Sequence, residues 1–271
     1  MKKNWQFWTL ATIITLLAAY YQRTTGPTYP KKVKAMLGNT EIKAKLRRSH
    51  AGMSNEKITL IAPGNGTLFY HRHPMNESFT AVEMTRSGDT LIAELPGQPM
   101  AGKLAYYIEI QHDGKTVRLP EKNPVVIRFR GDVPAGVMVP HILFMFLAML
   151  FSNLTGLFAL AKKRNIRKWT IITTFVLFVG GMILGPIVQK FAFNEFWAGV
   201  PFGWDLTDNK TLIAFIGWVV ALLLNLRKVR PWPVVIAAFL TIVIFSIPHS
   251  MFGSELNYST GTITQGIILL L

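Results

Sequence analysis

The sequence predicts an α-helical, polytopic membrane protein that carries an antiparallel β-sandwich domain outside the cytoplasm. Half of the 271 residues are hydrophobic and only 16% are charged, whereas soluble domains average about 25% charged residues. The apolar residues gather in long runs towards the two ends of the chain, and the residues between them alternate with a period of two. Two short loops between apolar runs are rich in lysine and arginine, as cytoplasmic loops of membrane proteins are.

The apolar runs define the expected spans, since a helix needs about 20 apolar residues to cross a bilayer. Five runs come near this length, at residues 5–21, 139–161, 169–188, 211–226 and 232–248. A last run at 261–271 covers about half a span, so it is either a partial sixth insertion or a span that this chain does not complete. We therefore expect an N-terminal anchor at 1–22, a β-sandwich at 23–138 and a helical domain at 139–271.

The basic loops predict the orientation. One loop holds five basic residues and the other holds three: Lys162, Lys163, Arg164, Arg167 and Lys168, then Arg227, Lys228 and Arg230. The positive-inside rule assigns both loops and the N-terminus to the cytoplasm, and the β-domain to the periplasmic side. Apolar helices with this bias fit a bacterial inner membrane, because the outer membrane holds barrels. The loops also explain part of the net charge of +15, so no nucleic-acid partner is expected.

The alternating segment predicts about nine short strands. Val33, Ala35 and Leu37 alternate with polar or basic residues, and Gly38-Asn39 forms a turn into a second strand of the same kind. This pattern is typical of a hairpin with one apolar and one basic face. Residues 22–138 hold 17 basic and 10 acidic residues, a net charge of +7, which suits either a solvated basic face or an acidic partner.

Several classes of chemistry receive no support from the residues. The chain has no cysteine, which excludes disulfides, thiolate metal sites and covalent c-type haem attachment. No nucleophile elbow, zinc-peptidase motif or phosphate-binding loop is present, so nothing indicates an enzyme. His71 and His73 share one strand face but have no third ligand, and no metal site is predicted. The expected spans lack charged residues, which disfavours ion-coupled transport.

Polar and aromatic residues gather at the predicted outer boundary of the membrane. His141 opens the second expected span and His249 follows the fifth, with the loop that holds Trp197, Trp204 and Asp205 between them in sequence. Two imidazoles at matching depth could ligate a haem b iron, and the aromatic loop could cover the macrocycle. Three acidic residues of this region leave alternatives open: a divalent-cation site, ion pairs with Lys190 and Lys210, or a helix cap made by Asp208. These residues are Glu195, Asp205 and Asp208.

The order of these features resembles the cytochrome c assembly proteins that handle haem and carry a tryptophan-rich WWD loop. Residues 137–250 contain Trp197-x-Gly199 and Trp204-Asp205, with a histidine two spans before and another two spans after. The resemblance implies haem bound by His141 and His249. Separately, residues 95–110 look like the late strands of immunoglobulin or fibronectin-type domains, in which a tyrosine bonds back to the backbone. Tyr106 or Tyr107 would take that role.

Two functions follow as expectations. The first is a non-catalytic accessory or scaffolding subunit of a larger inner-membrane complex. Its partners would be the lipid bilayer and other membrane-protein subunits, and its β-domain would dock a partner outside. The alternative is a haem-handling or b-haem-binding membrane protein with bis-histidine ligation at the outer face.

Overall fold

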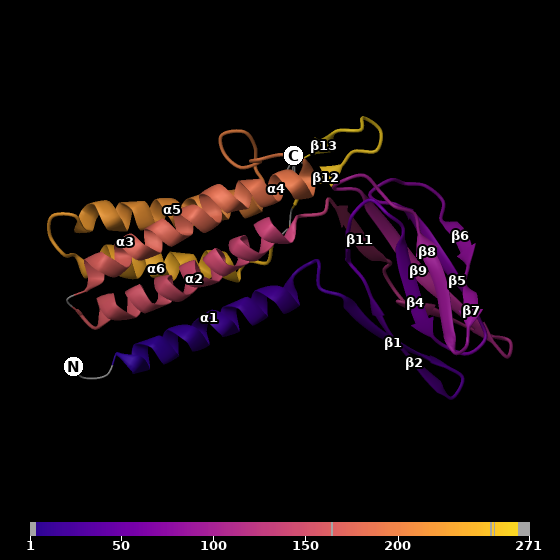
Figure 1. Ribbon diagram of the computed structural model, residues 1–271. Coiled ribbons are helices and arrows are strands. Elements are labelled where there is room, and N and C mark those ends of the chain that lie inside the picture. The colour runs from indigo at the N-terminus through magenta and orange to yellow at the C-terminus, as the bar shows by residue number, and fades with distance from the viewer. Residues whose placement is uncertain (1–3, 164, 250, 252, 265–271) are drawn as a thin grey trace. The chain divides into compact units, whose positions relative to one another are not determined.

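The computed structural model describes residues 4–163, 165–249, 251 and 253–264, and it divides into two compact units (Figure 1). The helical unit contains Met1–Gly26 and Val133–Gly253, and the β unit contains Pro27–Asp132 and Ser254–Thr264. The chain therefore enters the β unit twice. The second entry comes after the last helix, so the β unit is assembled from segments far apart in the sequence.

Helix α2 lies at the centre of the helical unit. It packs against α1 (Trp5–Thr25), α3 (Ile166–Leu177) and α6 (Pro231–Ser246) and also against the two segments that continue α3, while α5 (Leu206–Asn225) packs against α3 and α6. Helix α2 itself covers Ala135–Leu160. Helix α3 continues through a π-helical segment, η1 (Phe178–Leu184), into α4 (Gly185–Phe193). Figure 1 shows these helices running alongside one another.

Small and polar residues line the contacts of α2. The Asn153 amide nitrogen donates to the Thr15 hydroxyl of α1 at 2.9 Å, and the hydroxyls of Thr155 and Thr173 lie 3.1 Å apart. A β-carbon built at Gly156 would lie 2.6 Å from that of Ala238 in α6, so only glycine permits this approach. These small and polar residues of α2 thus face other helices, as such residues commonly do in membrane proteins.

The number of spans differs from the prediction. Within the described residues, three helices are long and apolar enough to cross a membrane: Ala135–Leu160, Ile166–Phe193 and Leu206–Asn225. Helix α6 is apolar but has only 16 residues, because the backbone becomes extended at Ile247, the residue before Pro248. Helix α1 has 21 residues but falls outside this set, since threonine, glutamine and arginine interrupt it. Ile263 and Thr264 form a short strand, and residues 265–271 lie outside the described residues.

The predicted fold class, with five spans, a partial sixth and a separate antiparallel β-sandwich, is therefore wrong. Counting apolar runs overlooked the polar residues of α1 and the early end of α6. The β unit is not a separate insertion either, because Ser254–Thr264 belongs to it. Nor is it wholly antiparallel, since strands β3 and β11 pair in parallel.

The main sheet of the β unit is built around β9 (Lys103–His112). Along one edge β9 pairs with β5 (Asn65–Arg72), which pairs in turn with β6 (Thr80–Glu83). Along its other edge β9 pairs first with β11 (Val125–Arg130) and then with β10 (Lys115–Leu119), and β3 (Ser49–Ala51) extends the sheet beyond β11. Alternate side chains of β9 are buried, so one face of this sheet forms the core.

The remaining strands cover that core. Strand β8 (Thr90–Leu95) lies between β4 (Glu56–Ile61) and β7 (Thr85–Ser87), and β1 (Lys31–Leu37) pairs with β2 (Thr40–Leu46). The predicted hairpin at Gly38-Asn39 is confirmed, with its apolar side buried and its lysines exposed. Tyr106 is fully buried, and its hydroxyl donates to the Arg47 carbonyl oxygen at 2.8 Å. Burial raises the pKa of this hydroxyl, which keeps it protonated as a donor.

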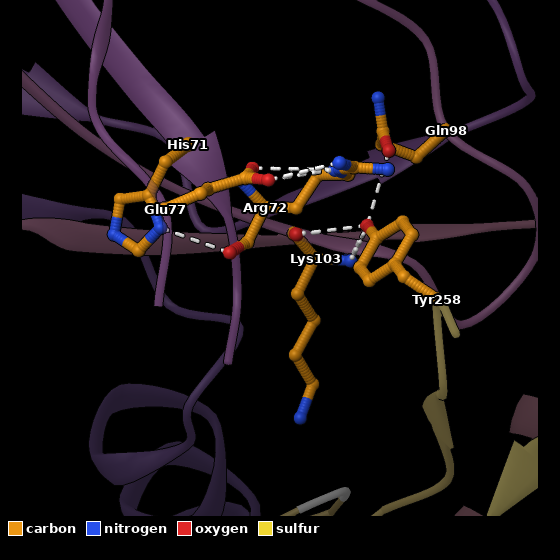
Figure 2. A network of polar contacts seen from close by, with 6 residues as sticks. All are labelled: His71, Arg72, Glu77, Gln98, Lys103 and Tyr258. Carbon is orange, nitrogen blue, oxygen red and sulfur yellow. Dashed lines mark hydrogen bonds and ion pairs between the residues drawn. The ribbon is translucent and has the colours of Figure 1, made fainter. Parts of the chain in front are cut away.

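The C-terminal segment forms a two-stranded hairpin of β12 (Glu255–Leu256) and β13 (Ile263–Thr264). The Leu256 amide donates to the Ala101 carbonyl oxygen at 3.1 Å, and Glu255 pairs with Lys103 at 3.0 Å. Figure 2 shows the Tyr258 hydroxyl beside Gln98 and the backbone of Lys103. These contacts fix the segment to the start of β9.

Candidate functional site

The first candidate site lies in the helical unit, where His141 of α2 faces the π-helical segment. The Nδ1 atom of His141 is 3.0 Å from the Gly180 carbonyl oxygen, and the Gly185 amide also bonds to this oxygen. Because a carbonyl oxygen only accepts, Nδ1 carries the proton, and the Nε2 atom keeps its lone pair. π-helical turns occur often at functional sites, and histidine ligands of metals commonly donate their other N–H to a carbonyl.

The second predicted ligand, His249, follows the end of α6. The residues before it are fixed, since the Lys210 ammonium donates to the Ile247 carbonyl oxygen at 2.7 Å. Desolvation by the surrounding protein atoms is the main cause that lowers the pKa of His249, and the charges of Lys210 and His141 lower it further. Part of the surface of His249 nevertheless stays exposed. The helical unit therefore places both histidines in one neighbourhood.

The aromatic loop between α4 and α5 is held by buried polar side chains at the start of α5. The Ala198 amide donates to Asp208 Oδ2 at 2.6 Å, and the Val200 amide donates to Asn209 Oδ1 at 2.8 Å. Asp208 is only 6% exposed. A β-carbon at Gly199 would come within 2.8 Å of both Asp208 and Asn209, so glycine is required at this approach. The loop therefore has a defined conformation.

Asp205 is the cap of α5. Its Oδ1 atom accepts from the Thr207 and Asp208 amides at 2.8 and 3.2 Å, as expected for an N-cap residue. The cap considered for Asp208 is thus made by Asp205, and Asp208 holds the loop instead. Lys190 and Lys210 both donate to backbone carbonyl oxygens, of Asn194 and Ile247.

The two tryptophans predicted to cover a haem differ in their surroundings. The Trp197 indole N–H donates to the Val200 carbonyl oxygen at 3.1 Å, within the loop itself. The side chain of Trp204 is 62% exposed, and neighbouring Phe202 is 78% exposed. The loop thus directs large apolar side chains outwards. Within the described residues, no group of three histidine, cysteine, aspartate or glutamate residues is arranged to hold a metal ion.

A second candidate site lies on the β unit, on the face of the main sheet that points away from the core. Phe69 of β5 stacks on Tyr107 of β9, with ring centres 4.9 Å apart and planes 9° from parallel. Phe79 packs edge-on against both Tyr107 and His71. The guanidinium carbon of Arg118, in β10, lies 3.7 Å from the centre of the Tyr107 ring. We call these five residues the aromatic strip: Phe69, His71, Phe79, Tyr107 and Arg118.

The register of the sheet explains the strip. Phe69 is directly opposite Tyr107, and Arg118 is directly opposite Glu109, two residues along the same face of β9. All five side chains keep part of their surface accessible, and Phe79 is 36% exposed. Arg118 Nε is buried and has no hydrogen-bond partner among the described atoms. A buried donor without a hydrogen bond costs free energy.

No protein-family model matches the chain. No curated protein matches it either. Both sites are accordingly assigned from their own geometry and chemistry.

The aromatic strip was missed in the sequence, although a signal was present. Phe69, His71 and Tyr107 all occupy alternate positions of predicted strands, on the side opposite the apolar core residues. What the sequence could not provide was the pairing of strands 38 residues apart, which brings Phe69 against Tyr107. The His141–Gly180 contact was missed because nothing in the sequence marked a π-helical turn.

Proposed function

We propose that this chain is an accessory subunit of a larger inner-membrane complex, and that it docks an extracytoplasmic protein partner through its β unit. The aromatic strip is the observation that carries this proposal. Tyrosine, phenylalanine and arginine are enriched at protein interfaces, and tyrosine and arginine dominate binding hot spots. A partner carboxylate or carbonyl would pair with the accessible part of the Arg118 guanidinium and extend its cation–π pair with Tyr107.

The orientation proposed for the β unit is supported by the two basic loops. Arg167, at the start of α3, donates to the carbonyl oxygens of Asn225 and Leu226 at the end of α5. The loop before α3 and the loop after α5 therefore lie at the same end of the helical unit. Basic loops at one end favour a cytoplasmic location for that end. The N-terminus would then be cytoplasmic and the β unit periplasmic.

Site-specific photo-crosslinking in native membranes tests the docking proposal. A crosslinker at Phe79 should capture a discrete partner, whereas one at Ile61, which is 70% exposed on β4, should not. Tyr107→Ala and Arg118→Ala should weaken partner binding about 30-fold each, corresponding to about 2 kcal/mol for a hot-spot residue. Equal capture at both positions, or unchanged binding in both variants, would contradict the proposal.

The alternative proposal is a haem-handling role, and it is favoured by the contact between His141 and Gly180. That contact leaves Nε2 of His141 as a lone-pair donor, and it orients the ring as a second-shell carbonyl does in metal sites. His249 would supply the other imidazole ligand, and Trp197, Trp204 and Asp205 would border the macrocycle. A bound b-type haem would supply one-electron chemistry.

An optical spectrum of the purified protein decides this alternative. After expression with ample haem, the proposal predicts a Soret band and sharpened visible bands on reduction with dithionite. His141→Ala and His249→Ala should each abolish or shift these bands, and His112→Ala, at a surface position of β9, should not. A colourless protein, or bands unaffected by both substitutions, would exclude the haem role.

A further inference from the structure

We infer that the loop at residues 196–204 is a lipid-inserting element, which enters the interfacial region of the bilayer that surrounds the helical unit. The inference goes beyond docking through the β unit, but it rests on the same membrane location. Its occupant is lipid, in contrast to the haem cover suggested by the sequence. Three observations carry the argument: the composition of the loop, its position between spans, and the way in which it is held.

The loop is uniformly apolar. Its residues are Phe196, Trp197, Ala198, Gly199, Val200, Pro201, Phe202, Gly203 and Trp204, and none of them carries a charge. Its large side chains point outwards, with exposed fractions of 58% for Phe196, 42% for Val200, 78% for Phe202 and 62% for Trp204. Exposed apolar residues that occur singly are ordinary, but a contiguous group indicates an interaction surface.

The position of the loop identifies lipid as the partner. It connects Ile166–Phe193 to Leu206–Asn225, two of the three helices that are long and apolar enough to cross a membrane. Its ends are therefore at the level where spans meet the headgroups. Tryptophan and other aromatic residues are enriched in that layer, where their rings lie among headgroups and upper acyl chains.

The polar groups of the loop are turned inwards, which argues against a protein partner. The amides of Ala198 and Val200 bond to Asp208 and Asn209, and the Asp205 amide bonds to the Ala198 carbonyl oxygen at 2.9 Å. The Trp197 indole N–H is also used within the loop. A specific protein interface needs hydrogen-bonding groups around its apolar centre. This loop directs mainly apolar surface outwards, which suits a fluid lipid environment.

The bond from the Ala198 amide to the buried Asp208 carboxylate and the close approach at Gly199 fix the loop in one shape before any lipid binds. A loop held in this way presents the exposed Phe202 side chain without losing backbone conformational freedom upon insertion. Insertion would add an anchor on the outer end of the helical unit, beside the end of α6, whose 16 residues are short for a span.

The absence of cysteine makes single-cysteine spin labelling direct. Phe202→Cys, Leu143→Cys and Asn39→Cys would each be labelled with a nitroxide in the full chain. The labelled proteins would be reconstituted in vesicles of phosphatidylcholine and phosphatidylglycerol. Collision rates with oxygen and with a neutral nickel chelate then report depth. Leu143 is 55% exposed on α2, and Asn39 is exposed in the β1–β2 turn.

The inference predicts that the labels at positions 202 and 143 collide mainly with oxygen, and that the label at 39 collides mainly with nickel. If position 143 reports lipid while 202 reports water, the inference fails and the membrane location stands. If position 143 also reports water, the membrane location fails and the inference with it. Shielding of position 202 from both reagents would indicate a protein cover and would equally overturn it.

A second measurement avoids labels. Brominated phosphatidylcholine quenches tryptophan only on contact with the acyl chains. The chain contains seven tryptophans, so the contribution of Trp204 is obtained by comparison with Trp204→Phe. The inference requires that this substitution lower the amount of emission lost in brominated relative to unbrominated vesicles. An unchanged loss of emission would contradict it, because Trp204 would then lie outside the bilayer.

Discussion

The Tyr258 hydroxyl accepts a hydrogen bond from the Lys103 amide at 2.9 Å, across 155 positions of sequence. The same hydroxyl lies 2.9 Å from the Lys103 carbonyl oxygen and 3.0 Å from Gln98 Oε1 (Figure 2), and it donates its one proton between them. The Arg72 guanidinium, held by Glu77 at 2.9 Å, lies 5.5 Å from the centre of the Tyr258 ring. The segment after α6 is thus part of the β unit, although helices α2 to α6 separate it in sequence from the other strands of that unit.

Removing the Tyr258 hydroxyl should destabilise the β unit. Tyr258→Phe keeps the ring over Arg72 but leaves the half-buried Lys103 amide without its acceptor. We expect a loss of about 1 kcal/mol in the free energy of unfolding, measured by thermal unfolding in detergent. Tyr20→Phe, at a side chain that is 70% exposed on α1, is the matched control and should change nothing. Equal stability of Tyr258→Phe and the parent chain would show that the segment is not held by this bond.

The stability of the β unit should fall in mild acid because of His73. Burial lowers the pKa of His73 below its ordinary value of 6.5. The charge of Glu255 opposes this shift, and the charges of Lys103 and His71 add to it. Between these two pKa values the unfolded chain binds more protons than the folded chain, so stability increases with pH there. The contribution of His73 is complete above about pH 6.5 and is lost as the pH falls towards its folded-state pKa.

Thermal midpoints at pH 7.5 and 5.5 measure this effect. The parent chain should lose stability between the two values, and His73→Gln should lose less. His112→Gln replaces a histidine at the exposed end of β9 and should retain the full pH dependence. If His73→Gln and the parent chain respond equally to acid, another group is responsible.

The contact between α2 and α6 should not tolerate a side chain at Gly156. A methyl group there would lie 2.6 Å from the Ala238 β-carbon, well inside the ordinary contact distance of about 3.5–4.0 Å. Gly156→Ala should therefore separate the helices and cost about 1–3 kcal/mol. Gly136→Ala, in the first turn of the same helix with open space around it, should be neutral or slightly stabilising. Circular dichroism during denaturation in detergent compares the two variants, and equal stabilities would refute close packing at Gly156.

Much of the local structure could be predicted, because its signals are local. The alternation around Gly38-Asn39 predicts the β1–β2 hairpin. Three of the predicted spans, 139–161, 169–188 and 211–226, coincide to within one residue at their ends with parts of helices that are long and apolar enough to cross a membrane. The other spans depend on tertiary context. Helix α1 includes Thr15, whose hydroxyl accepts a hydrogen bond from the Asn153 amide nitrogen of α2, and an apolar count assigns no role to that residue. The return of Ser254–Thr264 to the β unit depends on contacts with Ala101 and Lys103 that no sequence window includes.

The candidate sites also combine residues that local sequence signals indicate with contacts that depend on the tertiary structure. His141 and His249 could be selected from the sequence because they flank apolar runs, but their partners could not. The acceptor of His141 is the Gly180 carbonyl oxygen, which also accepts from the Gly185 amide in the π-helical turn, and the anchor of the residues before His249 is Lys210. The aromatic strip depends on strand register, which brings Phe69 and Tyr107 together only when β5 and β9 pair as they do.

The shape of the loop between α4 and α5 should depend on the Asp208 carboxylate. This side chain accepts from the Ala198 amide at 2.6 Å and also bonds to the Gly199 amide, so Asp208→Ala would leave two buried donors unpaired. We expect hydrogen exchange at these two amides to accelerate by at least about tenfold, since a loss of 1.4 kcal/mol in local stability corresponds to that factor. Asp113→Ala, at a side chain that is 86% exposed in the β unit, should leave exchange in the loop unchanged. Protection that survives Asp208→Ala would mean that Asn209 and the Asp205–Ala198 backbone bond hold the loop without the carboxylate, and the burial of Asp208 would then require another explanation.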